Sequence, residues 1–593
     1  MKKLVSLLIV TMLVLSSLIV AVPAMAEEGY KLSPKTQEAV DAGLVVLDGS
    51  QGTTIITDPD AFEAKYGKLT MLIVNNPDRT VPINELAMVK RWEKDTGVRF
   101  EWQAIPGDGA LEKINLMLTS GEKLPDAFFN FSDGKSTTVV VNALGQDVFM
   151  PTEDLIDNFM PTLKKVLEDN PNYMKEVTAP DGHKYGFPYI EQMFGLVLTP
   201  GPLLINQVWL DKVGMEMPKT VDELTEVLRA FKAAGDLNGN GIDDEIPMAT
   251  VFGAGSSDTF GSNDMFYRFT GAFGCEDTVC GGYENANHLR LIDGKVTYTA
   301  IDPAFGKTAM YFHTLYEEGL LNKDCFEPMT GSSKNYTNNE LDQDIALVGV
   351  CGVWTDMDIY NNAVRHEYVP IPQMTGEAGT VGNALNYSEL QDACDTAITM
   401  DCEFPEIIAR FTEYMISDPQ LSVQSNWGAI GSNYYLADDG VMRFHLDENG
   451  DIIVGTEWGD FDNNFGKARV NTTTCRGSMI VLNSYYNTPE QPDGVVEYTY
   501  DAANLLAFQI VNGKNEDLAK YDTIPKIMLL NQEQQEISRL VEVTNPIVKR
   551  YVQEWVTNGD VDSTWDAYVN ELKGAGIDRI VEIYQTALDR ING

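Results

Sequence analysis

The stretch TVDELTEVLRAFKAAGDLNGNGIDDEIPM, Thr220 to Met248, carries the clearest structural signals in this chain of 593 residues. Apolar residues recur at helical spacing through its first half. Thr220 followed by Glu223 is the pattern of a capping box at the start of a helix. Gly235 ends that helix, and residues 236–245 then alternate acidic or amide side chains with glycines. The stretch therefore predicts a helix that leads directly into a cation-binding loop.

The loop has six positions that offer oxygen ligands to a metal ion. Gly239 and Gly241 permit the positive φ angles with which such a loop curls. Carboxylate, amide and carbonyl oxygens suit Ca²⁺, which takes about 6–8 oxygens at roughly 2.3–2.6 Å, better than they suit Mg²⁺. The predicted ligands are Asp236, Asn238, Asn240, the carbonyl of Ile242, Asp244 and Glu245.

The loop begins like an EF-hand but closes differently. Pro247 stands at position 12 of that pattern, where an EF-hand has a bidentate Glu, and we expect no helix to follow. A second copy of the loop is absent from the sequence, which argues against a dockerin module. A solvated polar turn is the alternative interpretation. We predict a Ca²⁺ site with a structural rather than a catalytic role.

Strands and helices alternate outward from this loop. Residues 68–76 and 98–105 predict strands on either side of a helix, and 110–129 predicts a further helix and strand. This order is typical of βαβ units with parallel strands. Residues 193–214, interrupted by Pro-Gly-Pro, predict a crossing between two lobes, and the strand at 394–400 is a candidate second crossing. From about Thr523 the sequence predicts helices.

Other local patterns predict hairpins and core positions. An Asp-Gly turn closes a hairpin at 289–299, and an Asn-Gly turn closes another at 443–455. Trp92, Trp209 and Trp565 lie at helical apolar spacing or at a helix start, and we expect them in the core.

The first 26 residues have the pattern of a secretory signal peptide. Two lysines precede an apolar run to about Val22, and Ala24 and Ala26 supply a small-residue cleavage site after Ala26. A retained membrane anchor is the alternative, since the run is near the ~20 residues that a span needs. The segment contains no Cys for lipid attachment. We predict a secreted or cell-surface protein without stable membrane insertion.

The composition limits the partners. The formal charge is 43 − 88 = −45, which disfavours nucleic acid and anionic lipid as ligands. Seven cysteines are too few for a disulfide scaffold, and their odd number leaves at least one thiol without an internal partner. Cys275 and Cys280 are close enough in sequence to close a small loop. Five scattered histidines and the lack of a Cys-x-x-Cys pair make a zinc site improbable.

Several stretches resemble one protein family. They are INQVWLDKVGMEMPKTVDELTEVLRAFKAAGDLNGNGIDDEIPM, GKVTYTAIDPAFGKTAMYFHTLYEEGLLNKD, WVTNGDVDSTWDAYVNELKGAGIDRIVEIYQTALDR, EKLPDAFF and KYGFPY. They resemble the extracellular solute-binding proteins of ABC importers for oligosaccharides, in the Gram-positive and alginate-binding branch. Two departures stand out: Ile430 occupies the place of the Glu in a Gly-x-Glu-Gly run that the family often shows, and a lipidated Cys is absent.

The resemblance implies an α/β fold of the periplasmic-binding-protein type (class II), with two lobes, crossover strands and a helical C-terminal region. We expect residues 27–67 to be an N-terminal extension, 68–200 with 401–500 to form one lobe, and 201–400 with 501–593 to form the other. The implied function is capture of an oligosaccharide between the lobes by a monomer that delivers it to the permease subunits of an ABC transporter. The implied ligands of the calcium loop are the six named above.

A saccharide site needs aromatic rings for the flat faces of sugars and polar groups for their hydroxyls. A Gly-rich turn after the predicted strand at 345–352 places Trp354 and Asp356 at a carboxyl end, where such sheets bind ligands. The other predicted contacts are Trp427, Tyr434, Tyr435, Asp126 and Tyr189.

Two alternatives remain open. A secreted, calcium-stabilised glycoside hydrolase would share this composition but needs a carboxylate pair about 5–9.5 Å apart, and the sequence shows no catalytic motif. The same fold binding a peptide or another solute is the second. We predict a binding protein and no enzyme.

Overall fold

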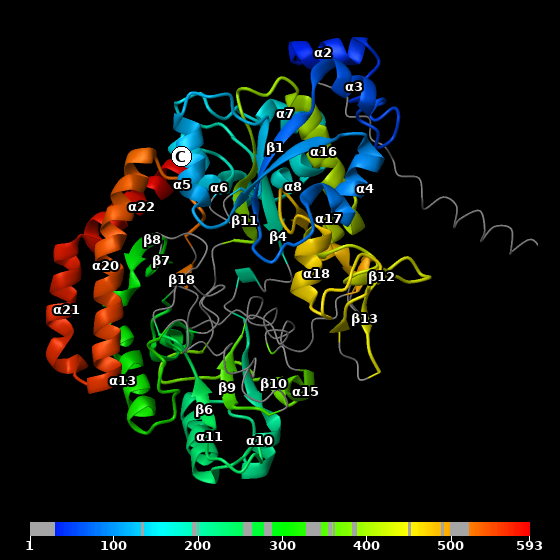
Figure 1. Ribbon diagram of the computed structural model, residues 1–593. Helices are drawn as coiled ribbons and strands as arrows, with labels where there is room; N and C mark the ends of the chain where they lie inside the picture. The colour runs from blue at the N-terminus through cyan, green and yellow to red at the C-terminus, as the bar shows by residue number, and fades with distance from the viewer. Residues whose placement is uncertain are drawn as a thin grey trace, which may run out of the picture.

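The computed structural model describes residues 30–131, 136–192, 197–198, 201–252, 264–277, 287–327, 345–353, 359, 362–381, 388–448, 452–487, 492–497, 521–522 and 524–592. Two α/β bodies, one above the other in Figure 1, are accompanied by a small β-sheet on one side and C-terminal helices on the other. Within this part of the chain, no helix combines the length and apolarity needed to cross a bilayer.

The first body is built on a six-stranded sheet with the order β15-β4-β11-β3-β1-β2. Strand β1 pairs in parallel with β2 and β3, and β11 runs antiparallel to both β3 and β4. The strands are β1 (Leu69–Asn75), β2 (Phe100–Pro106), β3 (Ala127–Phe129), β4 (Phe187–Glu191), β11 (Leu390–Ile398) and β15 (Ile480–Val481). The helices are η1 (Ile83–Glu85), α4 (Ala87–Thr96), α5 (Ala110–Thr119), α6 (Ser136–Asn142), α7 (Glu153–Phe159), α8 (Pro161–Asp169), α9 (Pro171–Glu176), α16 (Pro405–Ser417) and α17 (Pro419–Trp427).

The N-terminal residues pack onto this first body rather than standing apart. Helices α2 (Pro34–Asp41) and α3 (Pro59–Tyr66) add Ala39 and Phe62 to its apolar core. The Thr36 hydroxyl donates to Oε2 of Glu406 at 2.7 Å, so α2 is held against α16.

The second body contains two smaller sheets, with the orders β10-β5-β9-β6 and β18-β7-β8. Its strands are β5 (Leu203–Asn206), β6 (Ile246–Ala249), β7 (Leu289–Ile292), β8 (Lys295–Tyr298), β9 (Val348–Gly352), β10 (Tyr368–Pro370) and β18 (Tyr521–Asp522). Its helices are α10 (Gln207–Val213), α11 (Val221–Ala234), α12 (Met265–Phe269), η4 (Thr270–Phe273), η5 (Thr299–Ile301), α13 (Pro303–Glu317) and α15 (Asn362–Arg365).

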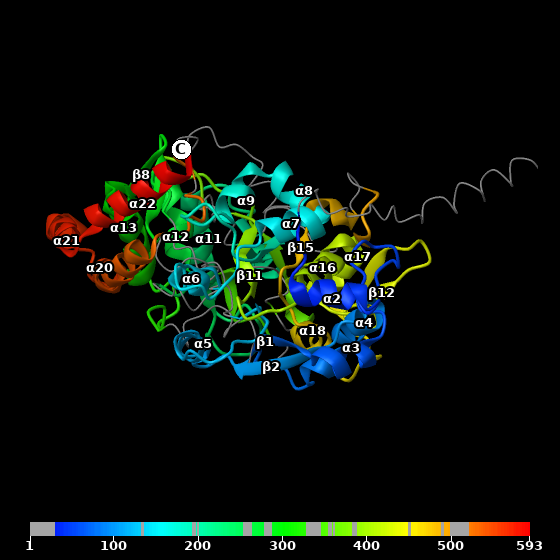
Figure 2. The same ribbon diagram turned by 90° about the horizontal axis from the view of Figure 1, so that it is seen from above.

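The predicted helical C-terminus consists of α20 (Asn531–Asn558), α21 (Val561–Ala575) and α22 (Ile577–Asn592). These helices lie beside α13 in both views (Figures 1 and 2). Trp555 and Tyr568 are buried in the same apolar core as α11 and α13. The C-terminal helices are therefore part of the second body.

The small sheet packs beside the first body around Trp427 and Val481. It contains β12 (Tyr434–Leu436), β13 (Met442–Leu446), β14 (Ile452–Ile453), β16 (Tyr486–Asn487) and β17 (Val496–Glu497), with α18 (Phe465–Thr472) and η7 (Asn483–Tyr485) alongside.

The local predictions around the opening stretch are confirmed. Thr220 and Glu223 form the reciprocal capping box, and α11 ends at Ala234, before Gly235 with φ 68°. Strand β6, not a helix, follows the loop. The hairpin β7–β8 turns at Asp293-Gly294, and Trp92 and Trp209 are buried. The Asn-Gly turn of the second hairpin lies outside the described residues.

The second crossing lies earlier in the chain than the sequence predicts. Residues 394–398 belong to β11, in the interior of the first sheet, so the crossing precedes Leu390. This strand is buried along almost its whole length, with Gln391 as its one partly exposed position, as expected for a strand in the interior of a sheet rather than for a passage between lobes. Consequently β11 lies before the expected boundary at residue 400 yet belongs to the first body.

Candidate functional site

The topology makes the carboxyl edges of the two main sheets face each other. The chain leaves β4 at Glu191 and enters β5 of the second body at Leu203, so the carboxyl end of β4 faces that body. Strand β4 is parallel to β3 and β1, because both β3 and β4 are antiparallel to β11. In the second body β9 and β6 run opposite to β5, so their carboxyl ends face the first body. Ligands of open α/β sheets bind at such carboxyl edges.

At the carboxyl end of β4 lies a buried polar network centred on Glu191. Its two carboxyl oxygens accept hydrogen bonds from Nδ2 of Asn426 at 2.6 Å, from Nε1 of Trp427 at 3.1 Å and from the hydroxyl of Tyr486 at 3.4 Å. Asn426 also donates to the hydroxyl of Tyr189 at 3.1 Å. Burial raises the pKa of Glu191 to about 8, opposed by the nearby cation of Arg469.

Arg469 of α18 contacts both Asn426 of this network and the aromatic ring of Trp427. Its guanidinium carbon lies 4.1 Å from the centroid of a Trp427 ring, a cation–π contact. It donates to the backbone oxygen and to Oδ1 of Asn426 at 2.7 and 2.8 Å. Trp427 is only 7% exposed, so in this structure its ring organises the polar edge and offers little open face to a ligand.

A strained loop lies next to this network. Cys475, Ser478 and, at the end of β3, Asn130 all have positive φ angles without being glycine. The backbone amide of Ser478 donates to Oδ2 of Asp395 at 3.0 Å, which pins the loop to the sheet. A methyl group on Gly477 would lie 2.0 Å from Cζ of Phe129, so this close approach requires glycine. Strained residues of this kind cluster at ligand sites.

The facing edge of the second body is organised by Arg268 of α12. This side chain is buried, and its guanidinium donates to the backbone oxygen of Gly201 at 2.6 Å and to that of Val353 at 3.4 Å. Gly201 precedes β5 and Val353 follows β9, so one cation joins the two strand ends. The amide of Thr250, which follows β6, donates to Oδ1 of Asn322 at 2.8 Å.

The predicted ligand-binding residues separate into different places. Tyr189 and Trp427 lie together in the Glu191 network. Tyr434 is buried in the small sheet, stacked on Phe444 with ring centroids 4.7 Å apart. Tyr435, on the opposite face of that strand, is 39% exposed.

Asp126 lies at the amino end of β3, opposite the carboxyl edge. Its Oδ2 accepts hydrogen bonds from the amide and the hydroxyl of Thr70, both at 2.7 Å, so it supports the pairing of β1 with β3. Trp354 and Asp356 lie outside the described residues, and so does Cys280, which is close enough to Cys275 in sequence to close a small loop.

Glu191, Asn426 and Arg469 were not among the residues predicted from the sequence. Asn426 is the neighbour of Trp427, which gave a weak signal, and Glu191 ends an apolar run. Arg469 is on a short helix without a recognisable pattern, and only the fold brings it to the ring.

In the predicted metal loop, backbone amides donate hydrogen bonds to carboxylate oxygens of the same loop. Asp236 accepts from the amides of Gly239 and Gly241 at 2.7 and 2.9 Å, and Glu245 accepts from the amide of Asn238 at 2.9 Å. Nδ2 of Asn238 and of Asn240 both lie 3.3 Å from Oδ1 of Asp244. Ile242 keeps its side chain outside, 60% exposed.

These residues fit a hard cation only if side-chain amide and backbone carbonyl oxygens bind it together with the carboxylates. Nowhere in the described ranges do three His, Cys, Asp or Glu side chains gather closely enough to hold a metal by themselves. Amide and carbonyl oxygens must therefore complete the coordination, as they do in Ca²⁺ loops.

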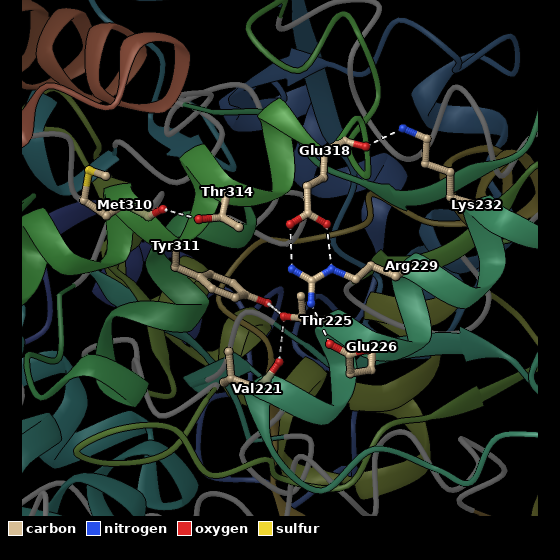
Figure 3. Close-up of polar contacts among 9 residues, drawn as sticks. All are labelled: Val221, Thr225, Glu226, Arg229, Lys232, Met310, Tyr311, Thr314 and Glu318. Carbon is tan, nitrogen blue, oxygen red and sulfur yellow. Dashed lines mark hydrogen bonds and ion pairs between the residues drawn. The ribbon is translucent and has the colours of Figure 1, made fainter.

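The last turns of α11, which lead into this loop, are bound to the C-terminal end of α13 (Figure 3). Arg229 of α11 donates to both carboxylate oxygens of Glu318, with Nε at 2.6 Å, and Lys232 donates to the backbone oxygen of the same residue. After this turn, Leu321 forms a bridge with Met248 of β6. The two ends of the loop are thus tied to one segment.

The chain matches known proteins along nearly its whole length. The family described as bacterial extracellular solute-binding protein matches residues 77–333. The fructooligosaccharide ABC transporter substrate-binding protein FusA of Streptococcus pneumoniae serotype 4 is 30% identical over 574 residues, which cover 95% of this chain and 98% of that protein.

Solved structures agree with this match. FusA of S. pneumoniae in complex with kestose has a TM-score of 0.70 at 30% identity, covering 88% of this chain and 99% of that chain. A FusA EF-hand mutant in complex with fructo-nystose gives the same values. The alginate-binding protein AlgQ2 without calcium ion shares the fold, with a TM-score of 0.61 at 19% identity over 88% of this chain and 98% of that chain.

The two facing α/β bodies and the near full-length match to FusA lead to one conclusion. The chain belongs to the bacterial extracellular solute-binding proteins of ABC transporters, and it binds its solute without converting it.

Proposed function

We propose that this protein captures an oligosaccharide between its two bodies and delivers it to the permease subunits of an ABC transporter. The observation that carries this proposal is the 30% identity to FusA over 98% of that protein's length. FusA is a fructooligosaccharide-binding protein, and its structure has been solved with kestose. A short fructose-containing oligosaccharide is therefore the proposed solute.

The proposed site lies between the carboxyl edges of the two sheets. On the first body, the network of Glu191, Asn426 and Arg469 holds the edge rigid beside the strained loop at 475–478. On the second body, Arg268 holds the strand ends that lead into Trp354 and Asp356, which stay our predicted contacts there. Rigid polar edges favour hydroxyl recognition because ordered donors and acceptors lose little entropy on binding.

We further propose that the loop at 236–245 binds Ca²⁺ in a structural role. In this structure the Asn238 and Asn240 side chains aim their NH₂ groups at Asp244. A cation at this place would be the positive partner of Asp244 and would turn the amide oxygens inward. The FusA EF-hand mutant and the calcium-free AlgQ2 structure support a cation loop in similar proteins.

Cellular placement follows from the same proposal. We propose that residues 1–26 are a secretory signal and that the mature monomer acts outside the cytoplasmic membrane. The strongly acidic net charge, −45 for the whole chain, is compatible with a neutral saccharide as solute.

Calorimetry on the mature chain, residues 27–593, tests this function. Kestose is titrated in Ca²⁺-containing buffer, with sucrose, a maltooligosaccharide and a tripeptide as comparisons. We expect saturable one-to-one binding of kestose and weaker or no binding of the others. Binding of the peptide, with none of any saccharide, would show that this chain uses the fold for another solute.

A further inference from the structure

The chain passes between the two bodies after β4 and before β11, and it passes from the small sheet to the second body between β17 and β18. Two of these crossings meet a fourth piece of chain, residues 524–529, which leads from β18 to α20. We name the contacts that join them the hinge cluster, and its members are Tyr173, Glu176, Gln192, Ser388, Glu389 and Lys526.

The segment 524–529 belongs to both bodies at once. Ile524 and Leu529 are buried in the apolar core of the second body, whereas Met528 is buried in the core of the first. Both ends of the segment lead to elements of the second body, β18 and α20. Any rotation of one body relative to the other must therefore either carry this segment along or shear its contacts.

Lys526 attaches this segment to the first body. Its side chain is 9% exposed, and Nζ donates to the backbone oxygens of Leu390, in a short contact, and of Gln391 at 3.1 Å. These carbonyls are at the amino end of β11, where the second crossing enters the first sheet. The backbone amide of Lys526 donates to Oε1 of Glu176 at 3.2 Å.

Helix α9 gathers the remaining contacts. Oε2 of Glu176 accepts from the hydroxyl of Ser388 at 2.7 Å, on the second crossing. The hydroxyl of Tyr173 donates to Glu389 of the same crossing and accepts from Nε2 of Gln192 at 3.1 Å, on the first crossing. One helix of the first body thus touches both crossings and the returning segment.

The charges in this cluster depend on one another. Glu176 is 2% exposed, and burial raises its pKa to about 7 while the cation of Lys526 opposes the rise. Glu389 is half-buried, and the partial loss of solvent raises the pKa of its carboxyl. A cluster of this kind tolerates little displacement, because buried charges need their partners.

We propose that Lys526 is a positioning residue for solute binding, which sets the orientation of the two bodies by holding segment 524–529 to β11 and α9. The proposal rests on the proposed function, in which the bodies close on a solute. Without this contact the free protein samples a wider range of orientations. Fewer molecules are then competent to bind, and the apparent dissociation constant rises by the inverse of the competent fraction.

The test compares Lys526→Met, which keeps the length of the side chain without its charge, with Lys549→Met, a matched change at an exposed position of α20. Lys526→Arg restores the charge, and Glu176→Gln weakens the cluster from the other side if Lys526→Met does not fold. Each variant is measured by small-angle scattering with and without saturating kestose, by calorimetry and by thermal unfolding.

We expect Lys526→Met to have a larger radius of gyration than the wild type when free, and the same radius when saturated. Its affinity for kestose should fall about three- to tenfold, which corresponds to a competent fraction reduced by the same factor. Lys526→Arg should recover most of the affinity, and Lys549→Met should behave as the wild type. A merely structural role would lower the melting temperature without this difference between free and bound radii.

An unchanged free radius in Lys526→Met or Glu176→Gln would overturn the proposal, whatever the affinity. The scattering of the free variants also tests the positioning role of Lys526 independently of the proposed saccharide-binding function. If the wild type binds no saccharide, the function fails, yet expansion of free Lys526→Met would still support the positioning role.

Discussion

Replacing Glu191 by Gln should change how the stability of the first body depends on pH. The carboxyl is buried among Asn426, Trp427 and Tyr486, and its pKa is raised to about 8 from a usual value of 4.5. The folded protein therefore keeps a proton on Glu191 that the unfolded chain releases above pH 4.5. This contribution to stability is complete below pH 4.5 and is lost as the pH rises towards 8.

The size of the effect follows from proton linkage. Each pH unit in this window changes the free energy of unfolding by about 1.4 kcal/mol, less as the pH approaches 8. Between pH 6 and pH 8 the wild type should lose about 2 kcal/mol through this group. Glu191→Gln has nearly the same shape and no proton to release, so it should lack this loss.

Urea unfolding followed by tryptophan fluorescence at constant ionic strength measures the difference between the two proteins. All other titrating groups contribute to both curves and cancel. Glu101→Gln, a change at an exposed position of β2, is the control and should follow the wild type. Parallel curves for wild type and Glu191→Gln from pH 6 to pH 8 would contradict this prediction, because they would mean that Glu191 is ionised in the folded protein at pH 6.

Four further outcomes are expected, two at the calcium loop and two at the carboxyl edge of the first body. When Ca²⁺ is added back to chelated wild type at one hundred times its dissociation constant, it should stabilise the protein by about 2.7 kcal/mol and raise its melting temperature. Asp236→Ala should abolish this rise. Chelation should leave the order of saccharide preference unchanged. Gly477→Ala should lower stability by about 1–3 kcal/mol, read from the urea midpoint, because the methyl group meets Phe129. Trp427→Phe should lower it by about 1–2 kcal/mol, since Glu191 loses a donor, and an unchanged midpoint would contradict the network.

The features that can be predicted from the sequence alone are those whose interactions are short-range. The capping box of Thr220 and Glu223, the end of α11 at Gly235 and the folded loop that follows depend on residues within a few positions of one another. The alternation of strands and helices also predicted the α/β class, and the family resemblance predicted two bodies. Local hydrogen bonds and side-chain periodicity leave a readable pattern in sequence because their partners are neighbours.

Which distant residues meet at the facing edges depends on the folding of the whole chain. Glu191 reaches Asn426 across 235 positions, and Lys526 reaches Leu390 across 136. Asp126 was predicted to contact ligand, but the direction of β3 places it at the edge of the sheet away from the second body. Such pairs carry no periodic signal: each is created by strand order and crossing direction, which depend on packing of the whole chain rather than on any one segment.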